Sequence, residues 1–250
     1  AILDAKTYQV FKRPSGLGDS RWSTVDPNIL FYISGNTFRK LNVRTDVTTV
    51  LHTFSEGTIS LGEYEGNISI GDAYVLLNVG SIVMVYDIKN DVVVAKKDLG
   101  GPRDWVSISA SGNYIVATGI NSIEPGRFVY DRNLNFLRKI FSKGEHGDLG
   151  YDAAGNEVYV QVCPMQMARL DNGQVTSWGI SLCGHLSTRN YLRPGWASMS
   201  SAGSNAEIFA LKLDPSKTVE RFAHTYATYA TYDAEAKGVF SPDGSKVMFN

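Results

Sequence analysis

The sequence predicts an all-β fold, a β-propeller of four-stranded antiparallel blades, and two repeated features support this. Turn-forming residues recur at intervals of 41–48 residues, and most of these turns precede an apolar strand pattern. A second turn lies inside each interval. A period of roughly 40–45 residues that contains several short strands is typical of propeller blades. No stretch shows sustained helical periodicity.

The strands of each blade follow from the positions of these turns. The first turns are predicted at residues 26–28, 71–72, 111–113, 155–156, 202–203 and 242–244. The second turns are predicted at residues 44–46, 89–91, 132–133, 171–173 and 214–216. Two hairpins in each repeat make a four-stranded blade, and radial stacking of the blades buries their faces. The sequence therefore predicts about five blades with partial ends.

These blades are expected to form one domain that spans residues 1–250. A propeller closes by pairing its two ends, whereas this chain stops within a blade. Five blades and a fraction do not make a closed ring. We therefore expect the chain to be part of a ring of six to eight blades.

Composition and charge narrow the class of partner. The chain has 250 residues, 43% of them hydrophobic, with 24 glycines, which suits a turn-rich globular protein. Its 24 basic and 25 acidic residues give a net charge of −1, so no global field attracts nucleic acid or an anionic membrane. No apolar stretch is long enough to span a bilayer. The glycine and aromatic content, two cysteines and an alanine at position 1 favour a secreted or periplasmic protein, with a cytoplasmic origin as the alternative.

Three of the four histidines are predicted to share one site. His146, His185 and His224 each fall in a segment predicted to lead into the first strand of a blade. In propellers such segments gather around one mouth of the central channel, so the three side chains are expected on one face. Arg103 lies in the same register before the third blade and is a candidate substrate-binding residue. His52 has no polar neighbours in its strand and is expected to be structural.

The segment 182–196 is the densest in polar chemistry and lacks the apolar alternation of its neighbours. Long polar loops on a rigid scaffold are common places for binding and catalysis. Its candidate residues are Cys183, His185, Arg189, Asn190, Tyr191, Arg193 and Trp196.

Three motifs in this region resemble a known group of proteins. Residues 145–152, 184–190 and 193–196 are similar to bacterial secreted propellers of carbohydrate-degrading systems, and 241–244 resembles the blade motif of TolB-like propellers. The resemblance extends to ulvan lyases and, more remotely, to oligogalacturonate lyase. It implies an extracellular polysaccharide lyase that acts on an acidic, uronate-containing glycan.

Lyase chemistry assigns roles to four of the candidates. β-Elimination needs a base for the C5 proton, an acid for the leaving oxygen and a cation on the uronate carboxylate. His146, Tyr191, Arg189 and Arg193 supply these groups, and Asn190 and Trp196 are candidate substrate contacts. Arg189 and Arg193 flank Tyr191 at i±2, so on an extended segment all three would point to one side and the cations would lower the Tyr191 pKa. The alternative is that these residues pair and pack within the fold.

A zinc site competes for some of the same residues. Cys183, His185 and His224 could hold zinc, although their spacing matches no standard zinc motif. Cys163 and Cys183 could instead be separate thiols or a disulfide.

The sequence is compatible with two classes of function. One is the polysaccharide lyase. The other is a non-catalytic glycan- or protein-binding propeller, with metal stabilisation as a variant.

Overall fold

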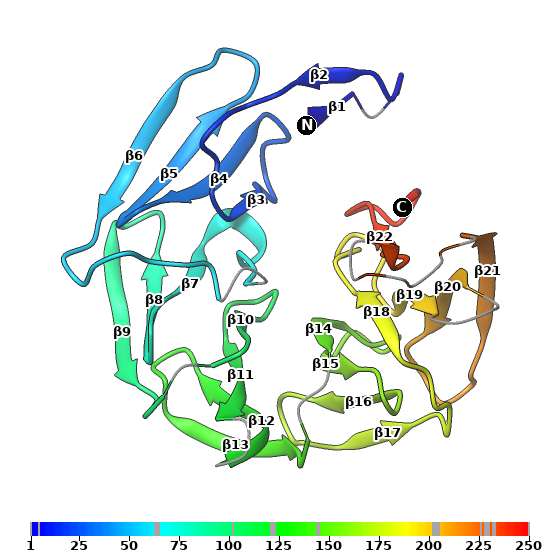
Figure 1. The fold of residues 1–250 in the computed structure, drawn as a ribbon. Coiled ribbons are helices and arrows are strands. Elements are labelled where there is room, and N and C mark those ends of the chain that lie inside the picture. Colours follow the sequence, from blue (N-terminus) through cyan, green and yellow to red (C-terminus); the bar gives the residue numbers. More distant parts are fainter. Residues whose placement is uncertain are drawn as a thin grey trace. The chain divides into compact units, whose positions relative to one another are not determined.

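The computed structural model describes residues 2–4, 6–62, 66–101, 103–120, 124–143, 146–201, 206–225, 227, 231 and 234–249. It is an all-β propeller fold built of antiparallel strand pairs. The strands of each sheet lie side by side in chain order (Figure 1). A short 3-10 helix, η1 (Ile70–Asp72), precedes β7 (Tyr74–Val79).

Five sheets correspond to the five predicted blades. Blade one contains β3 (Ser20–Trp22), β4 (Ile29–Ser34), β5 (Thr37–Asn42) and β6 (Thr48–Thr53). Blade two contains β7 (Tyr74–Val79), β8 (Ile82–Asp87) and β9 (Val92–Asp98), and single bridges from Ser60 and Ile68 to β7 stand in place of its first strand.

The remaining blades have four strands each. Blade three contains β10 (Val106–Ile108), β11 (Tyr114–Ile120), β12 (Glu124–Asp131) and β13 (Phe136–Phe141). Blade four contains β14 (Gly147–Tyr151), β15 (Glu157–Gln161), β16 (Gln166–Arg169) and β17 (Val175–Ser177). Blade five contains β18 (Gly184–Ser187), β19 (Trp196–Ser201), β20 (Glu207–Lys212) and β21 (Val219–His224).

The described residues also form two two-stranded sheets. β1 (Ile2–Leu3) pairs with β2 (Val10–Lys12), and β22 (Val239–Phe240) pairs with β23 (Val247–Met248). The described part of the chain holds no helix that is both long and apolar enough to cross a membrane.

One predicted turn needs correction. The turn at 202–203 lies outside the described residues, but the strands on either side of it, β19 and β20, are the second and third of blade five. It is therefore not equivalent to the other first turns. The connection between the first and second strands of this blade is the longer segment 188–195.

Burial follows the position of a strand in its blade. The second strands are almost wholly buried, as in β15, because both faces pack against other parts of the fold. The fourth strands alternate or are exposed, as in β9 and β21. Side chains with chemical roles are thus held most rigidly on the first and second strands.

Contacts divide the chain into two compact units. The first comprises residues 1–120 and 130–135, and the second comprises 121–129 and 136–250. Arg103 belongs to the first unit, and all the other candidate site residues belong to the second.

Each unit has an apolar core between neighbouring blades. In the first unit, buried residues of blades one and two form a cluster that includes Phe31, Phe38, Leu77, Met84 and Tyr86. In the second, blades four and five pack through residues that include Val158, Val160, Trp178, Met199 and Leu211. This second core supports the segments that carry the predicted site.

Candidate functional site

The structure brings two of the predicted histidines together. His146 directly precedes β14, the first strand of blade four, and His185 lies in β18, the first strand of blade five. Their imidazole ring centroids are 5.3 Å apart, with the ring planes tilted by 49°. His146 is exposed and His185 is half-buried, so a ligand that reaches one ring can contact the other.

A carboxylate that sequence reasoning missed orients one of these rings. Glu235 Oε2 lies 2.7 Å from His185 Nε2, and the two side chains are 29% and 15% exposed. A carboxylate on one imidazole nitrogen fixes the ring orientation and favours the tautomer that carries the proton on that nitrogen. His146, His185 and Glu235 are called the histidine cluster below.

An ion pair joins the two segments that carry the histidines. Asp148, two residues after His146, has its Oδ2 3.4 Å from the Nε of Arg189, and Arg189 follows β18. The Arg189 side chain is 31% exposed, whereas Asp148 is buried. Arg189 therefore presents a partly exposed cation four residues after His185.

The predicted lowering of the Tyr191 pKa is wrong. Burial raises the pKa of its phenol well above the usual value, and the Asp148 carboxylate raises it further, while Arg189 lowers it only in part. The hydroxyl is buried without a hydrogen-bond partner. The ring packs edge-on against Tyr151, with the two ring centroids 6.5 Å apart. Tyr191 is therefore a protonated, packed side chain.

The segment that carries Arg189, Tyr191 and Arg193 is not extended as predicted. Residues 190–193 form a turn in which the Arg193 amide donates to the Asn190 carbonyl at 2.9 Å. The Asn190 side-chain amide donates back to the Arg193 carbonyl at 2.6 Å. Alternation of side chains applies to an extended strand, so it does not place Arg189, Tyr191 and Arg193 on one side here.

A tyrosine-to-phenylalanine change tests this environment. The folded-state pKa of Tyr191 lies above the unfolded value of about 10, so its contribution to stability is complete below that pH and is lost as pH rises toward the folded pKa. Tyr191→Phe should therefore lessen the alkaline loss of stability, by up to about 1.4 kcal/mol per pH unit. Near neutral pH it should cost little, because it removes a buried hydroxyl without a partner. Urea unfolding across about pH 8 to 11 measures both effects.

Tyr8→Phe serves as the matched control for that experiment. Tyr8 is 66% exposed, so its removal should leave the alkaline slope unchanged. Equal slopes for wild type and Tyr191→Phe would contradict the burial of the Tyr191 hydroxyl.

Three other candidates meet in a separate small pocket. Asn190, Arg193 and Trp196 line this pocket, together with Ala210, Glu220, Phe222, Phe240 and Gly244. Asn190 is buried and held by its bond to Arg193, while Arg193 is exposed. The predicted substrate-binding and catalytic residues are thus divided between this pocket and the histidine cluster.

Arg103 is engaged within the first unit. Its guanidinium is buried and donates to the main-chain carbonyls of Thr118, at 3.0 Å, and Leu99. The first bond ties the segment before β10 to β11 of its own blade, and the second ties it to the residue that follows β9 of blade two. A structural role accounts for this arginine, and its predicted substrate contact stays a prediction.

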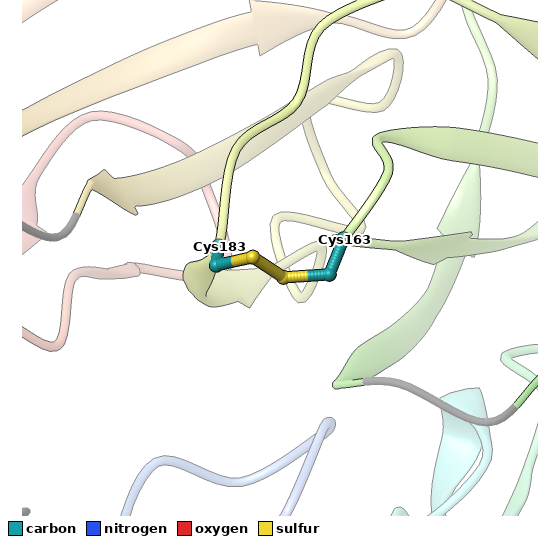
Figure 2. The surroundings of a disulfide bond; sticks show 2 residues. All are labelled: Cys163 and Cys183. Atoms are coloured by element: carbon teal, nitrogen blue, oxygen red, sulfur yellow. A yellow bond between two sulfur atoms is a disulfide. The ribbon is translucent and has the colours of Figure 1, made fainter.

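The structure does not assemble the predicted zinc ligands. Cys183, directly before β18, forms a disulfide with Cys163 in the turn after β15 (Figure 2). Its sulfur is therefore not a thiolate in this structure. The prediction that His224 leads into a sixth blade is wrong, because His224 ends β21 and lies 3.6 Å from a Glu207 oxygen. Among the residues that the structure describes, no three His, Cys, Asp or Glu side chains are grouped to hold a metal, and zinc stays a prediction.

Comparisons with known proteins agree with the architecture. No family model and no curated protein matches the sequence. Among solved structures, hydrazine synthase of Kuenenia stuttgartiensis aligns over 98% of this chain and 76% of its own, at 13% identity and a TM-score of 0.61. The Cps50 (Swd1) β-propeller domain of Myceliophteria thermophila aligns over 95% and 80%, at 12% identity and a TM-score of 0.64.

A TolB from Agrobacterium tumefaciens is also similar. It aligns over 86% of this chain and 78% of its own, at 17% identity and a TM-score of 0.56. The chain has a TolB-like β-propeller fold. Identities this low establish the fold and leave the chemistry to the side chains of the site.

Proposed function

We propose that this propeller is a polysaccharide lyase, which cleaves an acidic, uronate-containing glycan by β-elimination at the histidine cluster. The observation that carries the proposal is the pair of imidazoles 5.3 Å apart, one of them held by a carboxylate. Adjacent imidazoles can serve as a base and an acid in one reaction at neutral pH.

The reaction needs one proton removed and one supplied. A base takes the C5 proton of the uronate, and the C–H electron pair forms the C4–C5 double bond. The C4–O bond breaks, and its electrons leave with the oxygen, which takes a proton from the acid. The products are an unsaturated uronate and a shortened chain, and no oxidant or reductant takes part.

The two histidines fit these roles differently. His146 is exposed and is assigned as the base that contacts the C5 proton. His185 is assigned as the acid in its imidazolium form. Glu235 accepts the Nε2 proton and fixes the ring beside His146, so the proton given to the leaving oxygen is the one on Nδ1. A fixed proton donor is an advantage where the leaving oxygen departs.

Arg189 is assigned to the uronate carboxylate. The C5 proton becomes acidic only when charge on the adjacent carboxylate is offset, and a guanidinium can do this. Arg189 is partly exposed and follows the strand that carries His185. The resemblance of residues 145–152 and 184–190 to secreted propellers of carbohydrate-degrading systems supports a lyase in general, and it favours a secreted or periplasmic location.

A glycan- or protein-binding propeller without catalysis is the second candidate. It is favoured by the burial of the Tyr191 hydroxyl, which withdraws that group from substrate, and by the pairing of Arg189 with Asp148. In that case the histidine cluster would hold a ligand without reacting with it.

Incubation with ulvan and with polygalacturonate separates the two candidates. The lyase produces an unsaturated sugar that absorbs in the ultraviolet, and mass spectrometry of the products identifies the double bond. Binding measured by calorimetry without any unsaturated product would overturn the lyase and favour the binding module. The absence of both binding and product would reject both acidic glycans as ligands.

A further inference from the structure

A buried carboxylate joins the two strands on which the histidine cluster depends. Asp148 is 5% exposed, and its Oδ1 accepts a bond from the Leu149 amide at 2.9 Å. Its Oδ2 accepts from the Thr188 amide at 3.0 Å and lies 3.4 Å from Arg189 Nε. Burial of a charge is costly unless hydrogen bonds compensate it, so this carboxylate is held in one position.

Two of these donors belong to the neighbouring blade. Asp148 is in β14 of blade four, while Thr188 and Arg189 immediately follow β18 of blade five. The carboxylate therefore links the first strands of two blades at the point where β18 ends.

Glycine at position 150 permits the same close approach. A Cβ at Gly150 would lie 2.6 Å from the Thr188 Cβ and 2.8 Å from its carbonyl oxygen. Contacts this short cannot form, so a larger side chain would push Thr188 away from β14. Asp148 and Gly150 thus act together to hold the end of β18 against β14.

His185 lies on β18, and His146 directly precedes β14. His146 is two residues before Asp148, and His185 is three residues before Thr188. The offset between β14 and β18 therefore sets the separation of the two rings. The same carboxylate also orients the guanidinium of Arg189.

We propose that Asp148 is a positioning residue. It fixes the separation of the His146 and His185 imidazole rings and orients the guanidinium of Arg189. The inference rests on the proposed lyase function for its kinetic consequence. The expected effect on the separation of the two imidazole rings does not depend on any reaction.

Asp152 offers a matched control. It is buried at 7% and follows β14, and it accepts bonds from the Ala154 and Asn156 amides and from the Asn156 side chain. These partners all belong to the β14–β15 hairpin. Asp152→Asn removes a buried carboxylate of similar exposure without touching blade five.

The test compares Asp148→Asn with Asp152→Asn by two measurements. In NMR spectra of the imidazole carbon-bound protons, Asp148→Asn should shift the His146 and His185 signals, because the ring currents of the pair change. Asp152→Asn should leave both signals in place. On polygalacturonate or ulvan, whichever the wild type cleaves, Asp148→Asn should lower kcat/KM by about 10- to 100-fold, as is typical when a residue that orients a functional group is lost.

The imidazole signals decide whether Asp148 positions the two histidines. Unchanged imidazole signals in Asp148→Asn, or equal shifts in both variants, would overturn the positioning role. Shifted signals in a protein that cleaves neither glycan would uphold the positioning and reject the lyase. If Asp148→Asn does not fold, Gly150→Ala decides, because it moves Thr188 without altering a charge and should shift the same two signals.

Discussion

Loss of the Cys163–Cys183 disulfide is expected to lower the free energy of unfolding by about 3 kcal/mol. The two cysteines are 20 residues apart in sequence, and cross-linking a loop of this length restricts the unfolded chain by roughly that amount. For a protein of this size the loss corresponds to a fall in Tm of about 6–12 °C. Scanning calorimetry of the Cys163→Ser, Cys183→Ser double variant measures it.

Backbone bonds limit how far the cross-linked segments separate once the disulfide is absent. The Cys163 amide donates to the Leu182 carbonyl at 2.9 Å, and Met165 donates to Ile180 at 3.1 Å. We therefore expect the double variant to fold to the same structure, with lower stability. Reductant should destabilise the wild type and have no effect on the double variant. A reductant effect of equal size on both proteins would show that it does not act through this bond.

The repeat could be read from the sequence because each blade is built locally. Turns with residues such as Gly155 and Asn156 mark where a hairpin reverses, and the apolar pattern that follows marks a buried strand. The prediction failed at 202–203 because a glycine can mark any of the three turns of a blade. The first connection of blade five is eight residues long, 188–195, and has no short turn signal.

The site was predictable only where it depends on blade position. His146 and His185 were expected together because both lie at the first strands of successive blades, and their rings are in contact. His224 was misplaced because it ends a fourth strand, and its sequence neighbours resemble those of a connection. The expected lowering of the Tyr191 pKa failed because the side chain is buried near the Asp148 carboxylate and residues 190–193 form a turn, which the alternation rule does not describe.

Glu235 could not be found by any local signal. It is 50 residues from its partner His185, and it lies between two alanines in a segment with no strand alternation. Its role depends on the chain returning over β18, which is a tertiary contact. The burial of Asp148 is of the same kind, since two of its donors come from another blade.

Removal of either imidazole of the histidine cluster is expected to have the largest effect on activity. His146→Gln and His185→Gln should each lower kcat for cleavage of the acidic glycan by about 10²- to 10⁴-fold, the usual contribution of a general acid or base. Glutamine keeps polar atoms of similar reach but does not exchange a proton at neutral pH. The initial rate of unsaturated product formation measures the loss.

The fourth histidine provides the comparison that makes this result specific. His52 in β6 belongs to the first unit, where its Nδ1 lies 2.6 Å from an Asp91 oxygen and its ring contacts Phe54. His52→Gln alters that contact and should leave kcat unchanged. Calorimetric binding of the glycan should persist in His146→Gln, since Arg189 is assigned to the carboxylate and a base acts in the chemical step. Full activity in His146→Gln would remove it as the base, and equal losses in all three variants would show that general destabilisation, and not proton transfer, was being measured.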